Sequence, residues 1–252
     1  MPLRAFRFVR SLIFVFVAVM AVVLFVVRAK TARAAADADA MGGHMSMTTL
    51  RPIQPGDQAR ADAIVVAARK FADQYKDYRK ALADGYVIFH PELPQNVYHF
   101  TNNAKAPAAT LVFDPAEPTS LLYERVPPAK AGEQPGYKLV GVMYTAPYRA
   151  REAELDRRVP LSIARWHLHT NLCLPPTGKR DELGTLGGKF GLQGSIATEE
   201  ACNAEGGRFL PHIFGWMVHV YPYETSPAKI WAAGMDDEHG MQHDDMPAGM
   251  PM

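Results

Sequence analysis

One apolar stripe of helical period, followed by short segments of strand-like pattern, limits this chain to few fold classes. Between Ile64 and Leu82 the apolar residues recur at steps of three and four, which places them on one side of a helix. Residues 55–57 (Pro-Gly-Asp) precede this stripe and Gly85 follows it. We therefore expect an amphipathic helix that has Asp57 as its N-cap and ends at Gly85.

Beyond Gly85 the pattern changes to short apolar segments separated by Pro, Asn and Gly. These segments predict strands at 96–102, 109–113, 120–125, 137–145, 163–173 and 213–223. Short helices are expected at 149–158 and 197–204, and a glycine-rich loop at 175–194. The order of the elements predicts an α+β fold, with the N-terminal amphipathic helix packed on a mostly antiparallel sheet or a small open barrel.

The ends of the chain differ in composition from this domain. Residues 11–27 contain no charged side chain, so residues 1–28 are expected to be an N-terminal membrane anchor or a cleaved signal segment. Residues 29–56 predict a flexible tether, residues 57–232 a single domain, and residues 233–252 a disordered tail rich in Met, His and Asp. Both N-terminal alternatives predict export, to the periplasmic face of the bacterial inner membrane or, after cleavage, to the periplasm.

Cysteine content and net charge indicate which covalent bonds and which partners are expected. An exported chain with two cysteines, Cys173 and Cys202, is expected to form a disulfide, and the alternative is a metal-bound Cys173. The formal net charge of +1 gives no basic surface, so we expect no nucleic-acid partner, and nothing in the sequence identifies a protein partner.

The segment 165–173 carries the main chemical signal. As a strand it would place Trp166, Leu168 and Leu172 on one face and Arg165, His167, His169, Asn171 and Cys173 on the other. Two imidazoles at positions i and i+2 can bind one metal ion when a neighbouring strand supplies a third ligand. His219 is that predicted third ligand, with His99 as the fourth; His212 and Glu124 are alternatives for the fourth ligand or for its hydrogen-bonding partner.

The C-terminal tail adds a second metal-binding composition. It concentrates soft thioether and imidazole donors together with acidic residues, and its candidate ligands are His239, Met241, His243 and Met246. His44, Met45 and Met47 of the predicted tether add donors of the same kind. Donors of this kind favour copper, above all Cu(I), and zinc is the alternative ion.

Several segments resemble a group of uncharacterised exported bacterial proteins. Those proteins carry H-Y-x-N, D-P-x-x-P-E-x-L-x-Y-E, L-V-x-V-E-Y, H-x-H and L-H-V-W elements. The similar segments here are 98–102 (YHFTN), 114–124 (DPAEPTSLLYE), 139–144 (LVGVMY), 166–169 (WHLH) and 218–220 (VHV). The resemblance spans roughly residues 80–225 and implies a shared domain and a shared histidine set. Thr119 and Met143 stand where the group has Glu, so no carboxylate is expected there. The tail looks like those of periplasmic copper-handling proteins.

These patterns lead to one expected function and two alternatives. The chain is expected to be an exported, membrane-tethered protein that binds a metal ion, with copper favoured, through a strand-borne histidine site and a chelating tail. The first alternative is a metal-dependent enzyme with an open coordination position and Glu124 as acid or base. The second is a small-ligand binding module without metal, around His99, Asn102, Tyr98 and Asn171.

Overall fold

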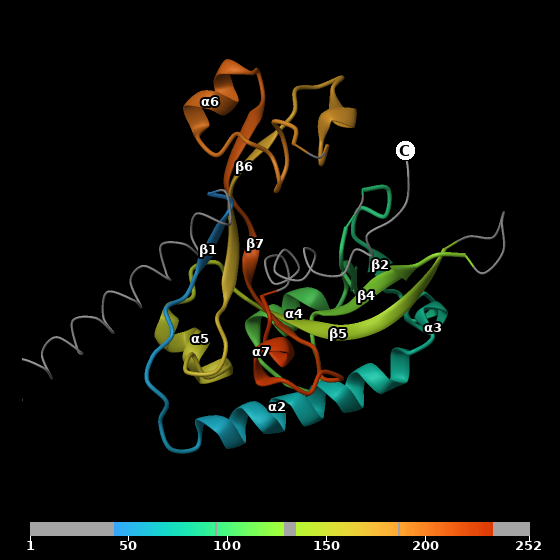
Figure 1. The fold of residues 1–252 in the computed structure, drawn as a ribbon, viewed down its shortest axis with the longest axis vertical. Coiled ribbons are helices and arrows are strands. Elements are labelled where there is room, and N and C mark those ends of the chain that lie inside the picture. Colours follow the sequence, from blue (N-terminus) through green and yellow to red (C-terminus); the bar gives the residue numbers. More distant parts are fainter. Residues whose placement is uncertain (1–42, 94, 129–134, 186, 234–252) are drawn as a thin grey trace, which may run out of the picture. The chain divides into compact units, whose positions relative to one another are not determined.

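The computed structural model describes residues 43–233 apart from 94, 129–134 and 186 (Figure 1). The predicted N-terminal segment 1–28, residues 29–42 of the predicted tether and residues 234–252 of the predicted tail lie outside this range. Within the described range no helix combines the length and apolar character needed to cross a membrane.

A single antiparallel sheet organises the described residues. Its seven strands have the spatial order β1-β6-β7-β5-β4-β3-β2, and every neighbouring pair is antiparallel. The strands are β1 (Met45–Met47), β2 (Val87–Ile88), β3 (Tyr98–Thr101), β4 (Ser120–Val126), β5 (Gly136–Ala146), β6 (His167–Leu174) and β7 (Arg208–Val220). The predicted α+β class and antiparallel sheet are confirmed, and the sheet is open, because β1 and β2 form its edges.

The amphipathic stripe forms α2 (Asp57–Ala72), a short 3₁₀ turn η1 (Asp73–Tyr75) and α3 (Tyr78–Ala83). The break arises at Asp77, which has extended backbone and accepts a hydrogen bond from the backbone N–H of Arg79, so it begins a new helix. Ile64 and Phe71 belong to the same buried apolar cluster as Val142 of β5. This cluster is the main core of the domain.

Asp57 has a different role from the predicted N-cap. Gly56 occupies the cap position, in left-handed backbone, and Asp57 is the first helical residue. Arg51 donates to both carboxylate oxygens of Asp57, at 2.6 and 2.9 Å, and the hydroxyl of Ser162 donates at 2.6 Å. These bonds hold the pKa of Asp57 well below its usual range and fasten the segment before α2 to the segment before β6.

Two segments differ from the sequence expectation. The predicted strand at 109–113 is wrong, because Ala106–Leu111 forms helix α4, which starts with a proline in its first turn. The prediction of a flexible tether is wrong for residues 43–56, where β1 pairs with β6 and both His44 and Thr48 are buried. Thr48 helps to hold this segment against the residues before β6, since its hydroxyl accepts a hydrogen bond from the backbone N–H of Trp166 at 2.9 Å.

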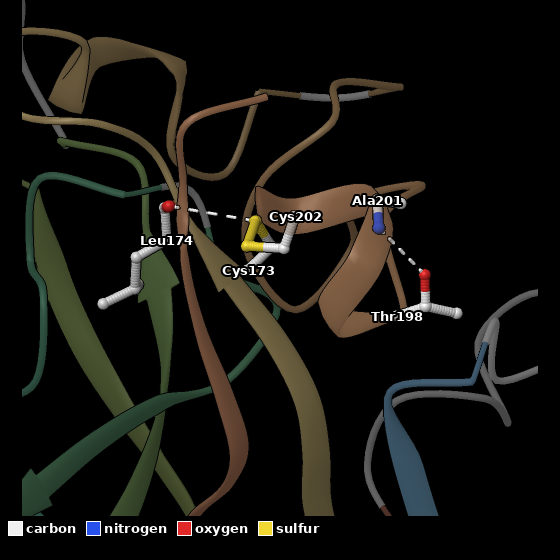
Figure 2. The surroundings of a disulfide bond; sticks show 5 residues. All are labelled: Cys173, Leu174, Thr198, Ala201 and Cys202. Carbon is white, nitrogen blue, oxygen red and sulfur yellow. Dashed lines mark hydrogen bonds between the residues drawn. A yellow bond between two sulfur atoms is a disulfide. The ribbon is translucent and has the colours of Figure 1, made fainter. Parts of the chain in front are cut away.

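A disulfide between Cys173 and Cys202 joins β6 to α6 (Glu199–Ala204), as Figure 2 shows. Both cysteines are fully buried and form a small second core with Phe190 and Ile196. The predicted pairing is therefore confirmed, and the alternative of Cys173 as a metal ligand is wrong. The remaining helical elements are α5 (Glu152–Arg158), η2 (Arg180–Glu182) and α7 (Pro227–Ile230).

Candidate metal centre

The strand register places four histidines on the face of the sheet opposite to the main core. Directly paired residues of antiparallel strands point to the same side. His99 pairs with Leu122, His219 with Met143, and His167 with Met217. Leu122, Met143 and Met217 form their own buried cluster, separate from the main core. His167 and His219 are themselves buried, so the histidines lie in a second, partly polar interior.

The imidazoles of these residues contact one another across several strands. His99 Nε2 lies 3.3 Å from His219 Nε2. The ring centroids of His167 and His219 are 4.9 Å apart, and those of His167 and His169 are 5.4 Å apart. We call His99, His167, His169 and His219 the histidine cluster. Because β4 and β5 lie between β3 and β7 in the sheet, the contact between His99 and His219 requires the sheet to curve strongly toward this face.

A bulge in β7 shifts the pairing register between β6 and β7 beside the cluster. His167 pairs with Met217 and His169 with Ile213, so β7 has two more residues than β6 between these pairs. Phe214 in this bulge has a φ of 60°, in the left-handed region. His167 and His169 share one side of β6 by its two-residue alternation, and the pairing of His167 with Met217 places that side with His219.

Replacement of Gly215 by alanine is expected to disrupt this bulge. A Cβ at residue 215 would overlap the backbone carbonyl oxygen of Ala146, which cannot move without shifting β5. We expect Gly215→Ala to lower the free energy of unfolding by about 1–3 kcal/mol, measured by urea denaturation. Gly136→Ala is the matched control, because a Cβ there meets no atom within 4 Å and the change should stay within about 0.5 kcal/mol. Equal stability of the two variants would contradict the role assigned to the bulge.

Burial keeps the cluster neutral. Desolvation, and after it repulsion from His169, lowers the pKa of His99 to about 4. Desolvation, and after it repulsion from His44, lowers the pKa of His169 to about 4 as well. The pKa values of His167 and His219 are lowered well below the usual range, first by desolvation and then by the neighbouring imidazoles. At neutral pH all four rings therefore have an unprotonated nitrogen, which is the form that binds a metal ion.

In their present positions, one pair of imidazole nitrogens has the separation that a metal ion requires, but the four rings do not yet surround a single point. The buried Nδ1 atoms of His167 and His219 have no hydrogen-bond partner in the described part of the chain. Two nitrogens bound to one tetrahedral Zn²⁺ at about 2.0–2.1 Å would lie about 3.3 Å apart, the separation of the His99 and His219 Nε2 atoms. Among residues 43–233 as described, however, no three His, Cys, Asp or Glu side chains converge as a ready-made cage. Metal binding would therefore require rotation of the rings of His167 and His169.

The other sequence candidates lie in different surroundings. Glu124 is exposed, and its carboxylate lies 3.9 Å from Lys138 Nζ, so the geometry does not support it as an acid or base. His212 stacks on Tyr148, with ring centroids 4.2 Å apart. The tail candidates His239, Met241, His243 and Met246 lie outside the described residues.

The pocket predicted around Asn102 is not supported. The Asn102 side chain donates to the Asp84 carbonyl and accepts from the backbone N–H groups of Ala104 and Lys105, so it holds the turn before α4. Tyr98 lies in the main core, on the opposite face from its neighbour His99. Asn171 donates to the carbonyl of Gly43 and secures the chain before β1.

Sequence reasoning missed two contributors to this face as site residues. His44, already a candidate metal donor from the sequence, is buried, and its Nε2 lies 2.7 Å from the Gly194 carbonyl oxygen. Met217 shares the face of His219 by the two-residue period of β7, a signal present in the sequence. Met143 reaches the same face only through the pairing of β5 with β7, which the sequence does not show.

Comparison of the chain with models of protein families, with curated proteins and with solved structures finds no match.

Proposed function

We propose that this protein binds a metal ion through His99, His167, His169 and His219, with copper as the favoured ion and zinc as the alternative. The observation that carries the proposal is the contact of four neutral imidazoles from three strands, of which His167 and His219 are buried and His99 and His169 are partly buried. Buried polar groups normally have hydrogen-bond partners, and two of these rings have a buried nitrogen without one among the described residues. A metal ion would satisfy such nitrogens.

The tail is proposed as an auxiliary chelator of the same ion. Ala233 is the last described residue, and its backbone lies near the ring of His219. The candidate ligands follow this point in the sequence, from His239, 6 residues after Ala233, to Met246, 13 residues after it. Ligands that follow Ala233 so closely in the sequence could exchange an ion with the cluster.

We further propose that the protein acts outside the cytoplasm, tethered to the periplasmic face of the bacterial inner membrane or free in the periplasm. The apolar run at 11–27 supports export. The disulfide between Cys173 and Cys202 supports an oxidising compartment.

The test is elemental analysis of the full chain, purified in detergent without a histidine tag after copper or zinc loading. Four proteins are compared: the wild type, a tail variant with His239, Met241, His243 and Met246 replaced by serine, a His167→Ala/His169→Ala variant, and a His90→Ala/His212→Ala control. We expect the first two and the control to retain stoichiometric metal, and the affinity of the cluster variant to fall by more than about 100-fold. If alanine prevents folding, His167→Gln/His169→Gln preserves most of the side-chain volume.

Two results would overturn the proposal of an ordered site. Loss of all metal in the tail variant would reduce metal binding to the tail. Absence of metal from the loaded wild type would leave the imidazoles as polar core residues.

A further inference from the structure

The methionines of the described residues all lie opposite a histidine of the cluster. Met143 pairs with His219, Met217 and Met47 both pair with His167, and Met45 pairs with His169. Residues 43–233 as described contain no other methionine. Directly paired side chains in antiparallel strands have Cβ atoms about 4.5–5.5 Å apart, within reach of a long thioether side chain.

Burial separates these methionines into two pairs. Met143 and Met217 come from adjacent central strands and are 6% and 4% exposed, in one apolar cluster with Leu122. Met45 and Met47 belong to the edge strand β1 and are partly exposed. The thioethers of Met143 and Met217 are thus the ones shielded from water beside the imidazoles.

Simple filling of space does not explain this distribution. Methionine is a flexible residue that fills irregular gaps in many cores. The main core of this domain is much larger, yet it contains aromatic and aliphatic side chains and no methionine among its described members. The thioethers are confined to the face that carries the imidazoles.

We infer that Met143 and Met217 supply thioether ligands beside the imidazoles, so that the buried site selects the soft monovalent ion Cu(I) over Zn(II). This inference rests on the proposed function, because it assigns the ion and two further ligands of the same site. Thioether sulfur binds Cu(I) well and contributes little to Zn(II), whereas neutral imidazole binds both ions. The low polarity of the cluster formed by Leu122, Met143 and Met217 also favours an ion of single charge over a divalent one.

The experiment compares Cu(I) and Zn(II) affinities of the full chain in detergent, with Cu(I) measured without oxygen by competition with a chromophoric chelator. The five methionines and two histidines of residues 235–252 are replaced by serine in every protein, so that the tail does not contribute. The test variant is Met143→Leu/Met217→Leu, which keeps an apolar side chain of similar volume. Met45→Leu/Met47→Leu is the control for loss of two thioethers at the partly exposed edge.

We expect the test variant to lose about 10–100-fold in Cu(I) affinity and to keep its Zn(II) affinity within about threefold. X-ray absorption of the Cu(I) form should show a sulfur neighbour in the parent protein and none in the test variant. Equal Cu(I) affinity in parent and test variant, or a copper spectrum with nitrogen neighbours alone, would overturn the inference. If the parent binds Zn(II) but not Cu(I), the inference fails while a metal site remains; if it binds neither ion, the proposed function fails as well.

Discussion

The metal-free protein is expected to lose much of its stability between pH 6.5 and pH 4. In the unfolded chain a histidine has a pKa of about 6.5. In the folded chain the pKa of His99 and of His169 is about 4, because burial disfavours the charged ring. Between these values the unfolded chain binds more protons than the native one, so the free energy of unfolding falls as the pH falls. Each of these two rings contributes about 3 kcal/mol to this loss of stability. The pKa values of His167 and His219 are lowered as well, so these rings destabilise the protein in the same direction as the pH falls.

Urea denaturation at a series of pH values between 7.5 and 4.5 would measure this loss. A small domain has about 5–15 kcal/mol of stability in total, so two such rings are enough to bring acid unfolding into this range. The Asp57 pair acts in a separate window: its pKa is depressed, so its stabilising effect is lost only as the pH falls below the unfolded value of about 3.8. His99→Gln/His169→Gln should flatten the profile above pH 4.5. A wild-type profile that is already flat between pH 6.5 and 4.5 would show that these rings are protonated or solvated in the native state.

Removal of the disulfide is the second change with a large expected effect. The bond between Cys173 and Cys202 closes a loop with a sequence separation of 29 residues. On the chain-entropy model such a closure stabilises the native state by roughly 3–4 kcal/mol, since it restricts the unfolded chain. Cys173→Ala/Cys202→Ala should lower the free energy of unfolding by this amount.

Metal content distinguishes this effect from damage to the histidine cluster. Both cysteines belong to the small core with Phe190 and Ile196, and the cluster histidines do not. The disulfide variant should therefore retain the metal ion proposed for the cluster below its unfolding temperature. Loss of metal from a still folded variant would show that the α6 region and the cluster are coupled. Unchanged stability would show that the loop between residues 173 and 202 is already restricted in the unfolded chain.

The sequence predicted those parts of this molecule that depend on local periodicity. The stripe from Ile64 to Phe71 and the alternation of His167 and His169 each reflect a rule that acts over a few residues. The disulfide was predictable for a different reason, because the chain has only two cysteines that can pair. The structure brings His167, His169 and His219 together as the alternation suggested.

Features that depend on distant contacts were predicted less well. The sequence predicts a tether at β1 because Met45–Met47 is too short to show a period, and its strand conformation comes from pairing with β6. The segment 109–113 has apolar residues compatible with a strand, but Asn102 and Pro107 start a helix immediately before it. The sequence also does not show that Glu124, the acid or base of the enzyme alternative, lies at an exposed strand end with its carboxylate 3.9 Å from Lys138 Nζ.

The order of the strands also has a consequence for self-association. The edges β1 and β2 have 3 and 2 residues, whereas the central strands β5 and β7 have 11 and 13. The outer side of β6 beyond β1 is covered in part by the glycine-rich segment, since the Gly191 N–H donates to the Cys173 carbonyl. The two edge strands themselves therefore offer only a few residues of backbone on which another chain could add a strand, which disfavours edge-to-edge aggregation at β1 and β2.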